Sequence, residues 1–245
     1  MNLNQDLLTS SYDYFLSEEF IAVKPAEPRD SSKLLSVDRK TGIIKHQIFK
    51  DILNYLNPGE LIILNDTRVI PARLYGIKNF HGARVEVFLV REIEKDTWLV
   101  LAKPAKRLKE NTIIAFKDGL EAKVQSILPT GERIIKFIYP ANKNFMEMLK
   151  EQGEVPFPPY IPKPECTPER YQTIYSKNEG SVAAPTAGLH FTEELLKKLR
   201  DKGITIGYIT LHVGLGTFLP LKTDIITEHK MHEEYYELSA ETAEL

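Results

Sequence analysis

The spacing of hydrophobic positions changes along the chain, and each change predicts a different kind of structure. The apolar run Leu61–Leu64 follows the turn residues Pro58 and Gly59, which predicts a buried strand. Beyond it, short apolar runs separated by turn residues continue to about residue 140. They predict strands at residues 85–90, 97–101, 112–116, 122–128 and 133–138. Five short strands at such spacing are typical of a small β-barrel or β-sandwich.

Helical spacing returns on both sides of a proline-rich stretch. Residues 142–152 predict a helix that ends at Gly153, and residues 192–202 predict a second helix with Thr192 as its N-cap. The inner faces of the two helices are Phe145, Met148 and Leu149, and Leu195, Leu196 and Leu199. Residues 204–213 are almost continuously apolar, as in a strand that is covered on both faces.

Domain organisation follows from this order. Residues 153–168 favour an extended crossing because they carry six of the 15 prolines, namely Pro156, Pro158, Pro159, Pro162, Pro164 and Pro168. We therefore predict a discontinuous α/β domain of residues 1–63 and 150–245, interrupted by an inserted β domain of residues 64–149. Residues 239–245 resemble an N-cap and the first turn of a helix, so we expect the natural sequence to continue.

Composition narrows the class of protein. Apolar residues make up 42% of the chain and charged residues 27%, as in a folded globular protein. The single cysteine, Cys166, excludes an internal disulfide and a multi-cysteine metal cluster. The sequence contains no apolar run of membrane-spanning length and no signal peptide. We expect a soluble, cytoplasmic protein.

The net charge of −2 conceals a basic middle region. Residues 65–136 contain 14 Lys and Arg against nine Asp and Glu. Four of these cations lie close together in a loop between predicted strands: Lys103, Lys106, Arg107 and Lys109. A basic loop on a small β domain fits binding to a nucleic acid backbone. The alternative is that the cations only solvate the strands; Trp98, Phe116 and Tyr139 nearby are expected in the core.

The first candidate site is Asn65-Asp66-Thr67-Arg68, directly after the predicted strand Leu61–Leu64. Open α/β sheets bind ligands at the carboxyl ends of their strands. Asp66 can accept hydrogen bonds from hydroxyls or amines, and Arg68 can bind a carboxylate or phosphate in bidentate fashion. The alternative is a capped turn with a surface ion pair.

Two further segments bring small residues to the ends of elements. Residues 180–192 enter the second helix through Thr186, Gly188 and His190, where free backbone N–H groups favour an anion or an oxygen-rich ligand. Residues 211–218 follow the covered strand and carry His212, Gly214, Gly216 and Thr217. They lack the third glycine of a dinucleotide-binding fingerprint.

Histidines are concentrated near the end of the chain. His229 and His232 could bind a metal together if their segment were helical. No H-E-x-x-H pattern or cysteine set supports a metal site, so acid–base or substrate-positioning roles are favoured for these residues and for His190 and His212. The alternative for each is a hydrogen-bonded structural histidine.

Several segments together closely resemble one family, the S-adenosylmethionine:tRNA ribosyltransferase-isomerases of queuosine biosynthesis. They occur in the family's order over nearly the whole chain: Tyr12–Tyr14, Pro28–Leu35, Asn65–Leu74, Pro156–Ile161, Glu169–Thr173, Gly180–Thr192, Leu211–Phe218 and His229–Glu233. The chain departs from the family's usual residues at Val23, Lys24 and Phe157. Family members also continue beyond Leu245, with further site-bearing motifs.

The resemblance implies an α/β sandwich domain interrupted by an antiparallel β-barrel domain. It also implies transfer and isomerisation of the ribosyl group of S-adenosylmethionine onto 7-aminomethyl-7-deazaguanine at the wobble position of a tRNA anticodon, with release of adenine and methionine. Asp66, His190, His212, His229 and His232 would then be acid–base candidates. Asn65, Thr67, Arg68, Thr186, Gly188, Gly214, Gly216 and Thr217 would be substrate-binding candidates. The implied reaction requires no metal and no redox cofactor, and no protein partner is evident from the sequence.

Two other functions stay open on sequence alone. One is a non-catalytic RNA-binding module that uses the basic loop. The other is an S-adenosylmethionine methyltransferase, against which the sequence lacks a glycine-rich loop after the first clear strand.

Overall fold

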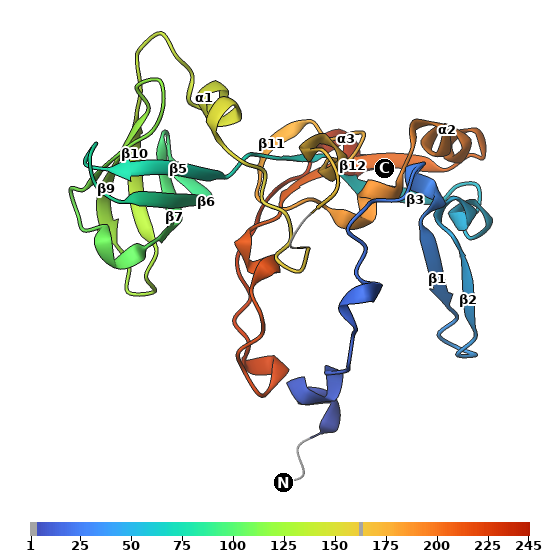
Figure 1. The fold of residues 1–245 in the computed structure, drawn as a ribbon. Helices are drawn as coiled ribbons and strands as arrows, with labels where there is room; N and C mark the ends of the chain where they lie inside the picture. The colour runs from blue at the N-terminus through green and yellow to red at the C-terminus, as the bar shows by residue number, and fades with distance from the viewer. Residues whose placement is uncertain (1–3, 162–163) are drawn as a thin grey trace. The chain divides into compact units, whose positions relative to one another are not determined.

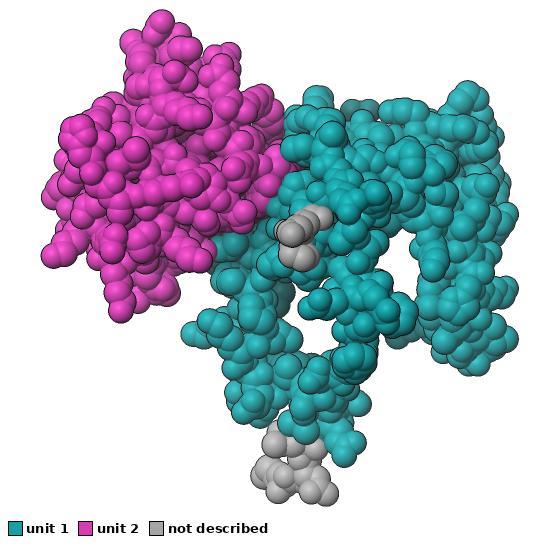
Figure 2. Space-filling model, in the orientation of Figure 1, with its two compact units in different colours: residues 1–68, 157–178, 183–245 teal, residues 69–156, 179–182 magenta. Residues whose placement is uncertain are grey.

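The computed structural model describes residues 4–161 and 164–245, so Pro162 of the proline-rich stretch lies outside it. The chain divides into two compact units, one of residues 1–68, 157–178 and 183–245 and the other of residues 69–156 and 179–182 (Figure 2). The mixed helix and strand content confirms the predicted fold class. The domain boundaries at residues 64 and 149 stay a prediction.

The second unit is built around a closed antiparallel barrel (Figure 1). Its strands are β5 (Arg73–Lys78), β6 (Arg84–Glu94), β7 (Thr97–Lys103), β8 (Ile113–Ala115), β9 (Glu121–Ile127) and β10 (Arg133–Ile138), in the order β10-β7-β6-β5-β8-β9. The expected β-barrel is therefore confirmed, and none of these strands joins the sheet that contains residues 61–65.

The barrel has one strand more than the apolar pattern predicted. β5 was missed because Gly76 interrupts its short run, and glycine normally weakens a strand. In the structure this glycine permits β8 to approach closely. A Cβ atom at position 76 would lie 2.6 Å from Ile114 Cγ2 and 2.9 Å from the Ala115 carbonyl oxygen. The absent side chain thus lets β8 pack beside β5.

Helix α1 (Phe145–Gln152) closes against the aromatic core of this unit. Asn144 caps it by accepting hydrogen bonds from two backbone N–H groups, so the helix begins slightly later than predicted. The predicted inner face is confirmed, because Phe145, Met148 and Leu149 are all buried. The Phe145 ring lies 5.9 Å from the ring of Trp98, which is buried as expected.

The first unit contains a three-stranded mixed sheet, β13-β12-β3. β3 (Leu61–Asn65) runs parallel to β12 (Thr205–His212), and β13 (Tyr235–Glu237) pairs antiparallel with β12. β1 (Lys33–Val37) and β2 (Ile44–Ile48) form a separate hairpin. β4 (Thr67–Val69) pairs with β11 (Asn178–Ser181), and the boundary between the units falls within both of these short strands.

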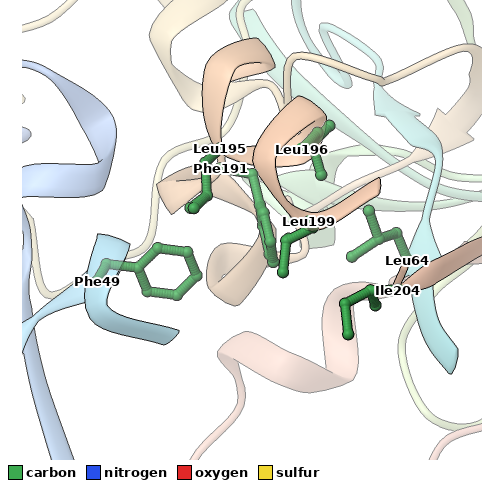
Figure 3. Close-up of a cluster of buried hydrophobic side chains, with 7 residues drawn as sticks. All are labelled: Phe49, Leu64, Phe191, Leu195, Leu196, Leu199 and Ile204. Atoms are coloured by element: carbon green, nitrogen blue, oxygen red, sulfur yellow. The ribbon is translucent and has the colours of Figure 1, made fainter. Parts of the chain in front are cut away.

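Helix α2 (Glu193–Asp201) contributes three leucines to the core of the first unit (Figure 3). As predicted, the Thr192 side chain caps it by accepting from the Leu195 N–H at 3.1 Å. The cluster of buried residues consists of Phe49, Leu64, Phe191, Leu195, Leu196, Leu199 and Ile204. The short helix α3 (Ala240–Glu244) contacts β12 through Thr242, whose hydroxyl donates to the Tyr208 carbonyl.

One burial prediction is wrong. β3 was expected to be a buried strand, yet Leu61 is 40% exposed and Ile63 is 43% exposed. Only the alternate side chains Ile62 and Leu64 join the core, so a single face of β3 is covered.

No helix of the described residues is both long and apolar enough to cross a membrane.

Candidate functional site

Asn65 joins the ends of β3 and β12 with its side chain. Its amide nitrogen donates to the Leu211 carbonyl at 2.9 Å, and its amide oxygen accepts from the Leu211 N–H at 3.0 Å. The same oxygen accepts from the Thr67 N–H at 3.1 Å. Asn65 therefore fixes the backbone on both sides of the predicted site at the point where the two parallel strands end.

Asp66 lies at the centre of a polar network that the sequence did not reveal. The Thr210 hydroxyl donates to Asp66 Oδ1 at 2.7 Å, and the Asn178 amide nitrogen lies 3.2 Å from both carboxylate oxygens. The same nitrogen lies 2.8 Å from the Thr210 hydroxyl oxygen. These donors fix the orientation of the carboxylate, which suits Asp66 to positioning or electrostatic work.

His212 is held beside this network by Thr67. The Thr67 hydroxyl lies 2.7 Å from His212 Nδ1, and the imidazole stacks on the Tyr235 ring with centroids 5.7 Å apart. Burial lowers the pKa of His212, while the negative charges of Glu237 and Asp66 act in the opposite direction. A lowered pKa keeps the ring neutral at pH 7, so one of its nitrogens carries a lone pair and can accept a proton.

Arg68 already has a partner. Its guanidinium donates to both carboxylate oxygens of Glu169, at 3.0 and 2.9 Å, and to the Ser176 hydroxyl at 2.9 Å. The Glu169 side chain is 70% exposed, so the pair is open to solvent. A substrate carboxylate would have to replace Glu169 in order to bind Arg68.

His190 lies in a second polar group, formed with the segment before β1. Its Nδ1 lies 2.9 Å from the Ser32 hydroxyl, and this hydroxyl donates to the Arg29 carbonyl at 2.9 Å. With the Ser32 proton directed to the Arg29 carbonyl, His190 Nδ1 can donate to the Ser32 oxygen in the tautomer that is protonated on Nδ1. In that tautomer the neutral ring carries its lone pair on Nε2, which can then accept a proton.

The surroundings of His190 favour this neutral form. Burial is the largest cause that lowers its pKa, and the positive charge of Arg170 is the next. A hydrogen bond to the Arg29 backbone acts in the opposite direction. The ring also packs 5.1 Å from the Phe49 ring at the edge of the apolar core.

The structure brings some predicted residues together and leaves others apart. Asn65, Asp66, Thr67 and His212 form one connected group. Within the described ranges, no hydrogen bond or ring contact joins His190 to that group. We expect Asn65–Arg68, Pro185–His190 and His212–Thr217 to converge on one cleft, and this stays a prediction.

Glycine at position 188 has a packing role. A Cβ atom there would lie 2.4 Å from the Tyr175 hydroxyl oxygen and 3.0 Å from Thr173 Cγ2. The neighbouring Thr186 is exposed and begins the short 3-10 helix Thr186–His190. The absence of a side chain at Gly188 is thus explained by Tyr175, without a ligand.

The segments after β12 lie against one another. The Gly214 N–H donates to Glu234 at 2.8 Å, and a Cβ atom at Gly216 would lie 2.6 Å from the His232 ring. Thr217 lies in the 3-10 helix Leu215–Phe218 and is exposed.

The helical arrangement that would pair His229 with His232 does not form. His229 follows a 3-10 turn and the chain then runs without helix to β13. Among residues 4–161 and 164–245, no three His, Cys, Asp or Glu side chains gather as a metal site.

The cations of the basic loop in the barrel unit are exposed to solvent. Lys103, Lys106, Arg107 and Lys109 are all exposed, whereas Leu108 between them is buried at 1% exposure. Leu108 therefore anchors the loop while the cations point outward. A fifth cation joins them, because Lys78 Nζ donates to the Arg107 carbonyl at 2.8 Å.

The residues that sequence reasoning missed are mainly the partners of those it found: Ser32, Glu169, Arg170, Ser176, Asn178 and Thr210. Ser32, Glu169 and Arg170 lie within segments that carry the family resemblance, so attention to polar residues in those segments could have found them. Asn178 and Thr210 had no such signal, because their role depends on two strands lying side by side.

Comparison with known proteins places the chain in a family. A crystal structure of S-adenosylmethionine tRNA ribosyltransferase from Thermotoga maritima is similar at 32% sequence identity; the match covers 95% of this chain and 62% of that one, with a TM-score of 0.38. The chain thus spans less than two thirds of the length of that relative. A family model described as queuosine biosynthesis protein matches residues 9–245. Because this match covers almost the entire chain, the chain belongs to the queuosine biosynthesis protein family.

Proposed function

We propose that this chain carries the catalytic region of an S-adenosylmethionine-dependent tRNA ribosyltransferase-isomerase. The ribosyl group of S-adenosylmethionine would be joined to the aminomethyl group of 7-aminomethyl-7-deazaguanine in the tRNA anticodon, with adenine and methionine as leaving groups. Membership of the family is the observation that carries the proposal. The preorganised group of Asn65, Asp66, Thr67 and His212 supports it.

The reaction needs general bases, and a histidine can act as a base only when its ring is neutral at physiological pH. The sulfonium of S-adenosylmethionine acidifies the adjacent 5′ carbon, and a base that removes this proton starts the loss of adenine. The aminomethyl nitrogen must also be neutral in order to attack. His212 and His190 suit these roles because burial lowers the pKa of each imidazole. The proposal calls on no metal or redox cofactor.

Product analysis tests the catalytic proposal. The chain is mixed with S-adenosylmethionine and tRNA that carries the aminomethyl base, and adenine and methionine are measured by chromatography. We expect equal amounts of the two products. Release of S-adenosylhomocysteine with a methylated tRNA would instead indicate a methyltransferase, and tRNA binding without any product would indicate an RNA-binding module.

Histidine variants then assign the roles. Replacement of a catalytic acid or base typically lowers turnover 10²- to 10⁴-fold. We expect His212→Gln and His190→Gln to lower kcat in this range, with a smaller effect on S-adenosylmethionine binding. His46→Gln is the matched control, since His46 is exposed in the β1–β2 hairpin. Unchanged kcat in either site variant would remove that histidine from the mechanism.

The basic loop is proposed to bind the tRNA backbone. Each phosphate contact contributes about 0.7–0.9 to the slope of log affinity against log salt concentration. The double variant Lys106→Ala/Arg107→Ala should therefore lower tRNA affinity and flatten this slope, equally for modified and unmodified tRNA. Lys197→Ala/Lys198→Ala on α2 removes the same charge elsewhere and serves as the control. An unchanged slope in the loop variant would exclude the loop from the RNA surface.

A further inference from the structure

The tip of the β5–β6 hairpin presents an aromatic ring to solvent. Lys78 and Ala83 close a loop of residues 79–82, with the Lys78 N–H donating to the Ala83 carbonyl at 3.1 Å. Phe80 lies in this loop and is 50% exposed. Its ring contacts no other aromatic ring in the described part of the chain. Burial therefore does not explain a phenylalanine at this position.

The backbone at this tip is unfavourable for a bulky residue. Phe80 has a φ of 64° and Asn79 a φ of 46°, both in the left-handed region. Asparagine is common there, but a large side chain such as phenylalanine is an outlier. Glycine would adopt the same conformation without steric cost. The local structure thus holds an exposed ring where folding alone favours glycine, and such strain is concentrated at functional sites.

One hydrogen bond joins the base of the tip to the basic loop, and two others join the tip to β8. Lys78 Nζ donates to the Arg107 carbonyl at 2.8 Å, next to the cationic side chains of that loop. On the β8 side, the Asn79 N–H donates to the Ile113 carbonyl at 2.8 Å, and the Asn79 side chain accepts from the Ile113 N–H at 3.3 Å. Phe80 is therefore held on a structured turn beside the loop of Lys103, Lys106, Arg107 and Lys109.

We infer that Phe80 is a stacking platform for an unpaired base of RNA, with the basic loop binding the neighbouring phosphates. Proteins bind single-stranded RNA with this combination of an exposed aromatic ring and adjacent cations. The occupant is a single-stranded loop, since bases in a duplex are already stacked on one another. This inference rests on the proposed tRNA function and adds the residue that distinguishes looped from paired RNA.

The test uses the full chain and two RNA probes of equal length. One is a hairpin with a seven-nucleotide loop, and the other is a blunt duplex with the same number of phosphates. The decisive variant is Phe80→Gly, which removes the ring and relieves the backbone strain. Its melting temperature should be equal to or above that of the unchanged chain, so a folding defect cannot explain lost binding.

We expect Phe80→Gly and Phe80→Ala to weaken binding of the looped RNA about tenfold or more and to leave duplex binding unchanged. Phe80→Trp should retain the affinity because it keeps an aromatic face. The salt slope should stay the same, since stacking involves no phosphate contact. Ile93→Ala is the matched control: Ile93 is 45% exposed, but it lies between Glu92 and Glu94 near the other end of β6.

The outcomes separate this inference from the proposed function. Full affinity of Phe80→Gly for the looped RNA, together with weakened binding by Lys106→Ala/Arg107→Ala, would overturn the stacking role alone. No RNA binding by the unchanged chain would overturn both. A change in molecular mass by light scattering in Phe80→Gly, without a change in RNA affinity, would assign the ring to contact between copies of the chain and also overturn the inference.

Discussion

The positive charge of Arg170 adds to the effect of burial in lowering the pKa of His190. Burial and the positive charge of Arg170 both lower the pKa of the imidazole, in that order of importance. Removal of this charge in Arg170→Gln should therefore raise the pKa of His190, measured by an NMR titration of the ring protons. Arg170→Lys keeps a positive charge and should leave the pKa closer to its original value. Equal pKa values in both variants would contradict the electrostatic explanation.

Packing at Gly188 makes a second prediction for a single residue. A Cβ atom there would lie 2.4 Å from the Tyr175 hydroxyl, so Gly188→Ala should destabilise the chain by about 1–3 kcal/mol, a typical cost of overpacking. Thermal or denaturant unfolding measures this loss.

Two further variants locate its cause. Tyr175→Phe removes the hydroxyl, so part of the loss should be recovered in the double variant Gly188→Ala/Tyr175→Phe. Gly214→Ala is the control, because the nearest atom to a Cβ there is 3.8 Å away. Equal losses in Gly188→Ala and Gly214→Ala would show that Tyr175 is not the cause.

At the scale of one element, the N-cap of α2 connects helix stability to the His190 region. The Thr192 hydroxyl oxygen accepts from the Leu195 N–H, and the hydroxyl donates to Asp30 at 3.3 Å. Thr192→Ala should lower the free energy of unfolding by about 1 kcal/mol, as is typical for a lost N-cap. Thr192→Ser keeps the hydroxyl and should cost less in the same denaturant measurement. Equal losses in the two variants would contradict the capping role.

Elements whose sequence pattern is local were predictable, whereas elements that depend on distant partners were not. The cap and inner face of α2 could be read from Thr192 and the leucines because a helix satisfies its own backbone. β5 was missed because Gly76 is explained only by the approach of β8. The apolar run of β3 predicts a buried strand, because such a run does not reveal that one of its faces lacks a covering layer.

The same distinction applies to the candidate site. Asn65, Asp66, Thr67 and His212 were identified because polar residues at strand ends are visible in sequence. Asn178 could not be found in this way, since its contact with Asp66 joins positions 112 residues apart. The tautomer of His190 likewise depends on Ser32, which packing brings beside it.

At the scale of the whole molecule, the two depressed histidine pKa values predict how stability depends on pH. His190 and His212 have pKa values below the ordinary 6.5 in the folded chain. As the pH falls through 6.5, the unfolded chain therefore binds more protons than the folded chain does. The free energy of unfolding should therefore decrease below about pH 6.5 and be fully regained above it.

Denaturant unfolding between pH 5 and pH 8 measures this dependence. The double variant His190→Gln/His212→Gln should show a flatter profile over the same range. The exposed control His46→Gln should keep the slope of the unchanged chain. A profile that stays equally steep without the two buried histidines would assign the pH dependence to other groups.

The closed barrel has a consequence for the order in which the chain folds during synthesis. All of its strands come from one continuous stretch, Arg73–Ile138, so every barrel pairing can form as soon as that stretch leaves the ribosome. β3, by contrast, is translated earlier but must wait for β12 before it gains its parallel neighbour. A closed barrel has no free edge, so it offers no unpaired backbone to β3 while β3 lacks its parallel neighbour. We therefore expect early closure of the barrel to reduce mispairing of β3 until β12 has been made.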